Sequence, residues 1–441
     1  MKKVFVETWG CQMNVSDSER VSTSLTRDGF EVTSDENLAD IIILNTCSVR
    51  EKAEQKLYSR VGRIRHAKRK KPVIGIMGCV AQLEGETLFK KIEGVDFVLG
   101  TRAVGRVSNA INETIRTGRN VADVGEREDD YDWTVADTHR HSPYVTFLPI
   151  IEGCNKFCTY CIVPFSRGRE RSLPASEVVR QVLELRRKGV REVHLIGQNV
   201  NSYRPETDSG LEGMRGKSAF SRLLRAVAAT GIERIKFATS FPRDFRFDIV
   251  DAIEEHENLC NWVHLPVQSG SNRVLKLMKR GHTIEKYFEK IDRLRSSSRD
   301  IALTTDIIVG FPRETEVDFL DSIKMIEYCG FDMAYIFKYS PRPGTPAFEM
   351  VDDVSGAEKT LRFLELERAQ KHIQNSRLQR YTDQVLKVLV EGASTRTEAG
   401  LTGHSTCHKI VNFTGSRDLL GKIVDVRITE IKANSLFGEA L

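Results

Sequence analysis

The sequence predicts an α/β protein of several domains: an open parallel α/β domain, a partial (β/α)6 barrel and a small antiparallel β-barrel. Three observations lead to this fold class. Apolar runs of the buried-strand type alternate with helical patterns near the N-terminus, and the alternation resumes after residue 140. The last stretch of about sixty residues changes to short alternating strands punctuated by glycine, which is typical of a small β-barrel.

The N-terminal domain, predicted over residues 1–118, contains four strands of this kind. They are KKVFVETWG at 2–10, ADIIILNTC at 39–47, KPVIGIMGC at 71–79 and VDFVLG at 95–100. A helix is expected over 16–30, where Ser16 and Glu19 have capping-box spacing. A charged helix follows the second strand. Strands that alternate with helices indicate a parallel sheet that is covered on both faces.

A polar segment without hydrophobic period, predicted as a linker over 119–139, separates this domain from a second one at 140–376. Helical patterns such as SEVVRQVLELRRKG lie between the strand candidates of the second domain. Because six β/α units are fewer than the eight of a closed barrel, a partial, open-sided barrel fits. The strand candidates are 144–151, 191–197, 233–239, 262–267, 301–309 and 332–339.

The C-terminal domain, predicted over 377–441, comes after a long helix that begins at about Gly356. Its short strands predict a small antiparallel barrel. From Asp383 to the end, the domain has seven Lys or Arg and seven Asp or Glu. It is therefore formally neutral and lacks the positive field that is typical of an RNA-binding patch.

The composition excludes several classes of protein. No run of eighteen apolar residues is present, and the N-terminus lacks the apolar stretch of a signal peptide. A cytoplasmic protein without membrane contact is therefore expected. The net charge of +5 permits binding to nucleic acid but does not demand it. Nine cysteines in a reducing compartment are more typical of metal sites or catalysis than of disulfides.

Cys11, Cys47 and Cys79 each end one of the apolar strands in the first domain. Since ligands of an open parallel sheet bind outside the carboxyl ends of its strands, these three thiols can converge in one crevice. Gly10 and Gly78 precede two of them and would let the backbone approach a bulky cofactor. Three ordinary buried cysteines are the competing interpretation. The repeated position at strand ends favours a cofactor site.

Cys154, Cys158 and Cys161 have the spacing C-x3-C-x2-C and follow the first strand of the second domain. A zinc site would need a fourth ligand, and the nearest histidines are not at finger-like spacing. Three thiols at a cubic iron–sulfur cluster leave one iron open. This motif, at the first strand of a partial barrel, resembles that of the radical S-adenosylmethionine (SAM) enzymes. The resemblance implies that the open iron binds SAM and that reductive cleavage gives a 5′-deoxyadenosyl radical.

Polar residues at later strand ends of the second domain are candidates for contacts with SAM. Gln198 and Asn199 follow the second strand, where members of the superfamily accept a hydrogen bond from the methionine ammonium group. Ser240 follows the third strand, and Gln268 and Ser269 follow the fourth. Together they mark one functional face of the barrel, at the carboxyl end of its strands.

The whole chain resembles the methylthiotransferases of this superfamily, which end in a small RNA-binding barrel called a TRAM domain. The segments GCQMN, NTCSVREKAEQK, VIGIMGCVAQ, GCNKFCTYCIVPFSRGRERS and YSPRPGTPA are similar to the branch that acts on prenylated adenosine in tRNA. The resemblance implies two [4Fe-4S] clusters, each held by three cysteines, with the N-terminal cluster carrying the sulfur. The chain departs from the family pattern at Trp9, Leu173, Phe241, Arg313 and the less basic LTGHSTCHKIVNF. None of these positions is a cluster cysteine.

The reaction implied by the resemblance is insertion of a methylthio group at C2 of N6-dimethylallyladenosine, at position 37 of tRNA beside the anticodon. No catalytic side chain is expected beyond those that hold the clusters. An external electron donor must reduce the clusters, and a sulfur donor must replenish the N-terminal one. The expected macromolecular partner is the prenylated anticodon loop of tRNA, and the protein is expected to be a monomer.

Basic residues close to the second cysteine motif are candidates for contacts with tRNA phosphates. Arg167, Arg169 and Arg171 adjoin the expected radical site, so they are better placed than other basic residues of the chain. In the C-terminal barrel, Lys409 and Asn412 of HKIVNF are expected to lie toward RNA.

Other functions stay open from the sequence. The same chemistry could act on threonylcarbamoyladenosine in tRNA or on a ribosomal protein, although GCQMN favours the prenylated nucleoside. A more remote alternative is a zinc-bound RNA-binding protein without catalysis. Metal analysis separates this alternative from the enzyme, since two cubic clusters hold about eight irons.

Overall fold

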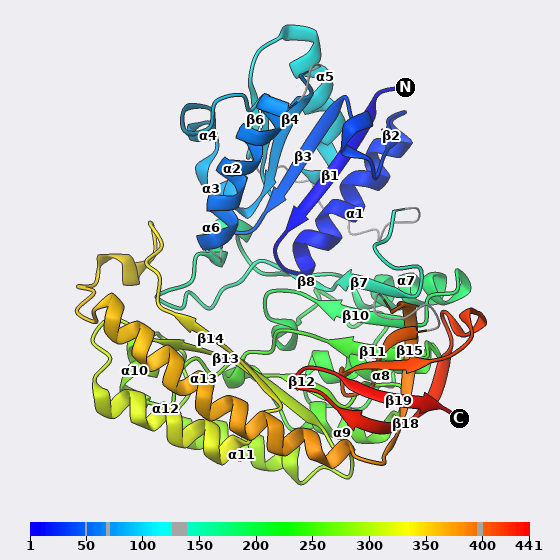
Figure 1. Ribbon diagram of the computed structural model, residues 1–441, viewed down its shortest axis with the longest axis vertical. Coiled ribbons are helices and arrows are strands. Elements are labelled where there is room, and N and C mark those ends of the chain that lie inside the picture. Colours follow the sequence, from blue (N-terminus) through cyan, green and yellow to red (C-terminus); the bar gives the residue numbers. More distant parts are fainter. Residues whose placement is uncertain (49–50, 68–70, 126–138, 395–399) are drawn as a thin grey trace.

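The computed structural model of the protein describes residues 1–48, 51–67, 71–125, 139–394 and 400–441. Three structural parts follow one another along the chain (Figure 1). The N-terminal α/β part, coloured blue to cyan, lies at one end of the molecule, and a larger green-to-orange part lies below it. The red C-terminal strands lie at the right of the larger part, and their core includes Ala302 of that part. Across the described ranges, every helix is too short or too polar to cross a membrane.

A six-stranded parallel sheet forms the N-terminal part, with the strand order β2-β1-β3-β4-β5-β6. The strands are β1 Lys3–Trp9, β2 Glu31–Val32, β3 Ile41–Thr46, β4 Val73–Gly78, β5 Phe97–Leu99 and β6 Val121–Asp123. The helices are α1 Gln12–Arg27, α2 Glu51–Ala67, α3 Cys79–Glu84, α4 Thr87–Lys91 and α5 Val107–Thr117. Helices α1 and α5 contribute to the core on one face, and α2, α3 and α4 to the core on the other. The predicted parallel sheet with two covered faces is therefore confirmed.

Two details of the N-terminal part differ from the sequence predictions. Helix α1 begins directly after the turn at Gly10, with Cys11 as its N-cap, so Ser16 and Glu19 lie inside the helix and form no capping box. The segment predicted as a linker at 119–139 supplies strand β6, which pairs with β5. Three residues are too few to show a hydrophobic period. The predicted linker over 126–138 lies outside the described residues.

Six parallel strands form the larger part in two three-stranded sheets, β11-β10-β7 and β12-β13-β14. A bridge between Ile235 and Leu259 links the two sheets, so the strands follow chain order around an incomplete barrel. The strands are β7 Val145–Pro149, β10 Glu192–Ile196, β11 Arg234–Phe237, β12 Trp262–His264, β13 Ala302–Val309 and β14 Met333–Lys338. The predicted partial (β/α)6 barrel is confirmed.

Helices cover the outside of the partial barrel and share one large apolar core with its strands. They are α7 Ala175–Arg187, α8 Ala219–Ala229, α9 Asp248–Glu255, α11 Ile284–Arg295, α12 Glu316–Cys329 and α13 Gly356–Leu378. Shorter elements lie near the carboxyl ends of the strands: β8 Ile151–Glu152 paired with β9 Arg171–Ser172, and the helices α6 Val163–Arg167 and α10 Asn272–Leu277. The core fixes the barrel, while the short elements shape the edge where function was predicted.

The C-terminal part is a closed five-stranded barrel with the strand order β15-β16-β17-β19-β18. Its strands are β15 Val385–Ala393, β16 Gly400–Ser405, β17 Ile410–Thr414, β18 Ile423–Ile431 and β19 Leu436–Ala440. The pairing is antiparallel as predicted, except that β17 and β19 run parallel and close the barrel. Its core includes Ala302 and contacts Trp262, at the starts of β13 and β12. The small barrel therefore covers the amino end of the larger one, opposite the predicted functional face.

Candidate functional site

Three cysteines of the N-terminal part come together at one edge of its sheet. Cys11 follows β1, Cys47 follows β3, and Cys79 opens helix α3 directly after β4. These three strands are neighbours in the sheet, and a hydrogen bond joins the thiols of Cys11 and Cys47. A Cβ atom at Gly10 would come within 2.8 Å of the Cys47 Cβ, so only glycine allows this close approach. The structure thus places the three cysteines at neighbouring strand ends, and their role in holding a cofactor stays a prediction.

The charges around this first thiol group favour a thiolate at Cys11. The hydrogen bond from Cys47 and the nearby Arg167 guanidinium lower the pKa of Cys11 to about 6. Burial raises the pKa of Cys79, and Arg167, which also donates to this thiol, opposes the rise. Since the thiolate is the form that binds metal, this environment suits a cation or a metal cluster.

Arg167 corrects one sequence prediction. It was expected to meet a tRNA phosphate, but its side chain is only 2% exposed. It donates to Asp17 of α1 at 2.6 Å and to Glu152 of β8 at 3.1 Å. These two carboxylates satisfy the guanidinium in a dry environment, so it is not available to RNA. Arg167 instead ties the N-terminal sheet to the partial barrel beside the first thiol group.

The second thiol group, formed by Cys154, Cys158 and Cys161, lies in the loop between β8 and α6. A tight turn joins Cys161 to Cys158 through a 2.9 Å backbone hydrogen bond, and Phe157 adopts a left-handed conformation with φ 47°. Burial, with the neighbouring Cys158 as a further cause, raises the pKa of Cys154 to about 11 and that of Cys161 to about 12. The three cysteines therefore stand in one short loop whose turn brings Cys158 and Cys161 close together.

Arg280 is a functional candidate that sequence reasoning missed. Its Nη1 atom lies 3.6 Å from the Cys158 sulfur, and its guanidinium lies 4.3 Å from the centre of the Phe241 ring. It is 4% exposed and is held by the carbonyl of Pro266. A buried cation at this position would stabilise the negative charge of thiolates or of a cluster bound by them. Because Arg280 follows α10, more than a hundred residues from the cysteines, no local motif marks it.

The candidates for SAM contacts differ in whether their polar atoms already have hydrogen-bond partners within the protein. The Gln198 Oε1 and Ser240 Oγ atoms are buried without a hydrogen-bond partner in the described structure. Asn199 is engaged, because its Oδ1 accepts from the Phe241 amide and its Nδ2 donates to Asp244. Unpaired buried polar atoms are costly, so the first two residues are the better candidates for a bound ligand.

Gln268 and Ser269 lie at the fourth strand end, as predicted. Gln268 adopts a left-handed conformation with φ 81°. Its amide donates to the Asp306 carbonyl and its carbonyl accepts from the Ile308 amide, both in β13. The Ser269 side chain is fully buried, and its hydroxyl accepts from the Ser271 amide. A backbone held in this strained conformation is typical of functional loops.

The remaining RNA candidates differ in exposure between the partial barrel and the small barrel. Arg169 and Arg171, at and next to the short strand β9, are exposed. Lys409 corrects a second prediction: its amine points at the Asp332 carbonyl at 3.4 Å, inside the contact between the two barrels, and burial lowers its pKa. Asn412, on β17, is half-buried. Lys409 is therefore turned away from a phosphate, because Asp332 binds it.

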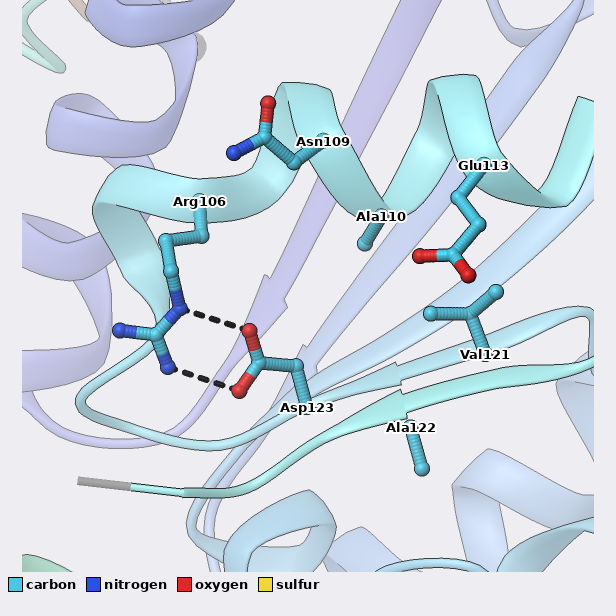
Figure 2. A pocket seen from close by; sticks show the side chains of 7 residues that line it. All are labelled: Arg106, Asn109, Ala110, Glu113, Val121, Ala122 and Asp123. Carbon is cyan, nitrogen blue, oxygen red and sulfur yellow. Dashed lines mark hydrogen bonds and ion pairs between the residues drawn. The ribbon is translucent and has the colours of Figure 1, made fainter. Parts of the chain in front are cut away.

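A surface pocket lies elsewhere, between α5 and β6 of the N-terminal part (Figure 2). Arg106 and Asp123 form a two-bond ion pair at its end, at 2.6 and 2.7 Å. Glu113 points from the helix toward Val121 of β6, whereas Asn109 points away from that strand. Since Arg106 and Asp123 are paired with each other and neither thiol group belongs to the lining, this pocket is not the candidate site.

Three families match successive segments of the chain. "Uncharacterized protein family UPF0004" matches residues 3–100, "Radical SAM superfamily" matches 148–326 and "TRAM domain" matches 379–441. The first match covers Cys11, Cys47 and Cys79, and the second covers the C-x3-C-x2-C motif. With the partial barrel and the small closed barrel, these matches define a radical SAM enzyme that carries a TRAM domain.

Curated relatives narrow this class. The tRNA-2-methylthio-N(6)-dimethylallyladenosine synthase of Haemophilus ducreyi is 43% identical, over 100% of this chain and 92% of the relative. The synthase of the same name from Clostridium tetani is 42% identical, over 99% and 95%. The chain therefore belongs to the family of tRNA-2-methylthio-N(6)-dimethylallyladenosine synthases.

Solved structures show the same fold at low sequence identity. The radical SAM methyltransferase TsrM from Kitasatospora setae matches with a TM-score of 0.56 and 14% identity, covering 79% of this chain and 74% of that one. The cobalamin-dependent SAM radical enzyme OxsB matches with a TM-score of 0.52 and 12% identity, covering 85% and 56%. At these identities the matches support the arrangement of the sheet and the barrel alone.

Proposed function

We propose that the protein replaces the C2 hydrogen of N6-dimethylallyladenosine in tRNA with a methylthio group, at position 37 beside the anticodon. The observation that carries the proposal is the pair of three-thiol groups, one at the edge of the N-terminal sheet and one at the carboxyl end of the partial barrel. The relatives that share the full length of the chain are named for this reaction. A single thiol group would suffice for a radical alone, so the second group points to sulfur transfer.

The cofactors in this proposal are SAM and two [4Fe-4S] clusters, each held by three cysteines. Cys154, Cys158 and Cys161 would hold one, and Cys11, Cys47 and Cys79 the other. The residues fit such groups, because each set of thiols lies beside a buried arginine and Gly10 permits the close approach of Cys47 at the first. When bound, the clusters and SAM supply the radical and the sulfur that an unactivated C2 carbon requires.

The protein's own groups would position these cofactors. Arg280 sets a positive charge against the second thiol group, and Arg167 sets one against the first. Gln198 and Ser240, with Asn199, Gln268 and Ser269 around them, would orient SAM at the carboxyl end of the barrel strands. The proposal also includes an external electron donor, a sulfur donor, a monomeric state and action in the cytoplasm.

The first prediction concerns SAM. Changing Gln198 to leucine, or Ser240 to alanine, should each weaken SAM binding roughly tenfold, since one lost hydrogen bond costs about 1–1.5 kcal/mol. Equilibrium dialysis of labelled SAM against cluster-loaded protein measures the affinity. Ser298→Ala, at an exposed position after α11, is the matched control and should bind as the unchanged protein does. Unchanged affinity in both test variants would remove these two residues from the SAM site.

The second prediction concerns tRNA. The double change Arg169→Ala/Arg171→Ala should weaken tRNA binding and reduce the slope of log affinity against log salt by about two, one for each phosphate contact. Filter binding at several salt concentrations gives the slope. Arg187→Ala/Arg368→Ala removes the same charge from exposed positions on α7 and α13 and should leave the slope unchanged. Equal effects in the two pairs would mean that only net charge matters.

Nucleoside analysis of tRNA from a strain that lacks this protein tests the proposed function in the cell. The methylthio-prenyl nucleoside should disappear while the prenylated precursor accumulates. The contradicting result is a methylthio-prenyl nucleoside that stays at its normal level, while a methylthio group is lost from threonylcarbamoyladenosine or from a ribosomal protein. That result would favour one of the alternative substrates.

A further inference from the structure

A cluster of metal-binding side chains lies far from both thiol groups, where the C-terminal barrel covers the amino end of the partial barrel. Glu192 and His194 come from β10, and His404 comes from β16. The ligand atoms of these three residues all lie within 4.8 Å of one another. The His404 Nε2 atom is 2.9 Å from each carboxylate oxygen of Glu192, and the His194 Nε2 atom is hydrogen-bonded to the same carboxylate.

A third imidazole stands next to this group. The His408 ring centre lies 4.7 Å from that of His404 and 5.8 Å from that of His194. His408 adopts a left-handed conformation with φ 61°, and its amide donates to the Ser405 carbonyl in the turn between β16 and β17. A non-glycine residue pays a strain energy in this region of backbone space, so the turn holds the ring in place against a local preference.

The surroundings of the cluster are those of a built site. Glu192 is 0% exposed, His194 3% and His404 5%. The His194 Nδ1 atom is buried without a partner in the described structure. The second nitrogen of His404, Nδ1, is 2.7 Å from the Glu391 carboxylate. A carboxylate behind a histidine is the arrangement that orients imidazoles toward metal ions.

Positive groups also face the cluster and would repel a bound cation. Arg234 lies 3.6 Å from Glu192, and its guanidinium donates to the carbonyls of His404 and Lys387. The Lys236 amine lies 4.0 Å from the centre of the Trp262 ring, and burial lowers the pKa of this lysine to about 7. The carboxylates of Glu192 and Glu391 offset these cations, and an ion would take the place of imidazole protons when it binds.

The geometry points to a structural Zn²⁺ site formed by Glu192, His194 and His404, which joins the C-terminal barrel to the partial barrel. The neighbouring His408 would supply a fourth ligand by turning its ring toward the other three. Three imidazole nitrogens and one carboxylate oxygen are ligands that zinc accepts in a closed four-coordinate site. The hydrogen bonds that now link the imidazoles to Glu192 hold the donors close together before an ion arrives. The site is independent of the cysteines and of the proposed reaction.

The test uses the full-length protein with its thiol sites reconstituted with iron and sulfide. After incubation with Zn²⁺ alone and gel filtration, plasma mass spectrometry should find about one zinc per chain beside the iron. X-ray absorption at the zinc edge should show only nitrogen and oxygen neighbours, at about 2.0–2.1 Å, and no sulfur at about 2.3 Å. Zinc coordinated by sulfur would overturn the proposal, and so would a zinc content below about a tenth of an atom per chain.

Variants separate this site from adventitious zinc. His404→Gln and His194→Gln, one on each barrel, should each lower bound zinc at least about fivefold while leaving the iron content unchanged. His372→Gln is the matched control, because His372 is exposed on α13. Zinc should also raise the thermal unfolding midpoint of the unchanged protein and of the control but not of the two variants. Zinc retained in both variants would contradict the assigned ligands, whether or not their stability changes.

Discussion

Replacing Cys158 by alanine should abolish methylthio transfer and remove about half of the iron, from roughly eight atoms per chain to roughly four. Two thiols would then remain in the loop before α6, and the buried Arg280 would lose its sulfur partner. A site with two thiolates cannot hold a cubic cluster that needs three. Iron is measured by plasma mass spectrometry on anaerobically reconstituted protein, and SAM cleavage by the yield of 5′-deoxyadenosine.

The reciprocal variant makes this prediction specific. Cys79→Ala should also remove about four irons and abolish transfer, but it should leave cleavage of SAM to 5′-deoxyadenosine intact, because the second thiol group is unchanged. Cys329→Ala is the matched control, since Cys329 is the buried last residue of α12 and belongs to neither thiol group. If Cys158→Ala kept all its iron, or if Cys79→Ala lost SAM cleavage as completely as Cys158→Ala, the assignment of the two groups would be wrong.

Replacing Arg167 by methionine should destabilise the protein by about 3–5 kcal/mol, the usual cost of leaving buried charges without a partner. Glu152 would lose its cation, and Asp17 would keep only the more distant Arg20, at 3.9 Å. Both carboxylates are almost fully buried. Because the three groups join the N-terminal sheet to the partial barrel, the loss should appear as earlier unfolding of the N-terminal part. Urea unfolding, followed by circular dichroism and by limited proteolysis, measures the shift.

Two further variants test whether the effect arises from the charge. Arg169→Met, two residues away at an exposed position, should change stability by less than about 0.5 kcal/mol. Adding Asp17→Asn to Arg167→Met should recover part of the lost stability, because one of the stranded charges is removed. A cost below about 1 kcal/mol for Arg167→Met would show that Asp17 and Glu152 are solvated or protonated instead.

Most of the fold could be predicted from hydrophobic patterns among residues that are close in sequence. The β/α alternation predicted both sheets, because a parallel strand is buried on both faces and reads as a continuous apolar run. The same runs fixed the ends at which Cys11, Cys47 and Cys79 stand. Strand β6 was not predicted because it is only three residues long. The start of α1 was placed too late because its N-cap, Cys11, makes no side-chain capping hydrogen bond and so leaves no capping signal in the sequence.

The side-chain environment of the site was less predictable, since it depends on partners distant in sequence. Arg167 and Asp17 are 150 residues apart, so spacing alone made this arginine look free to bind RNA. Lys409 looked exposed for the same reason, although Asp332 faces it across the contact between the barrels. Glu192 and His404 are 212 residues apart and meet only because one barrel covers the other.

The most direct test of the proposed reaction is mass spectrometry of nucleosides from a defined tRNA. Reconstituted protein is incubated anaerobically with tRNA that carries N6-dimethylallyladenosine at position 37, together with SAM, a reductant and sulfide. The proposed function predicts that this nucleoside gains a methylthio group at C2, and that tRNA with unmodified adenosine at position 37 stays unchanged. A prenylated nucleoside that keeps its C2 hydrogen while SAM is cleaved would contradict it.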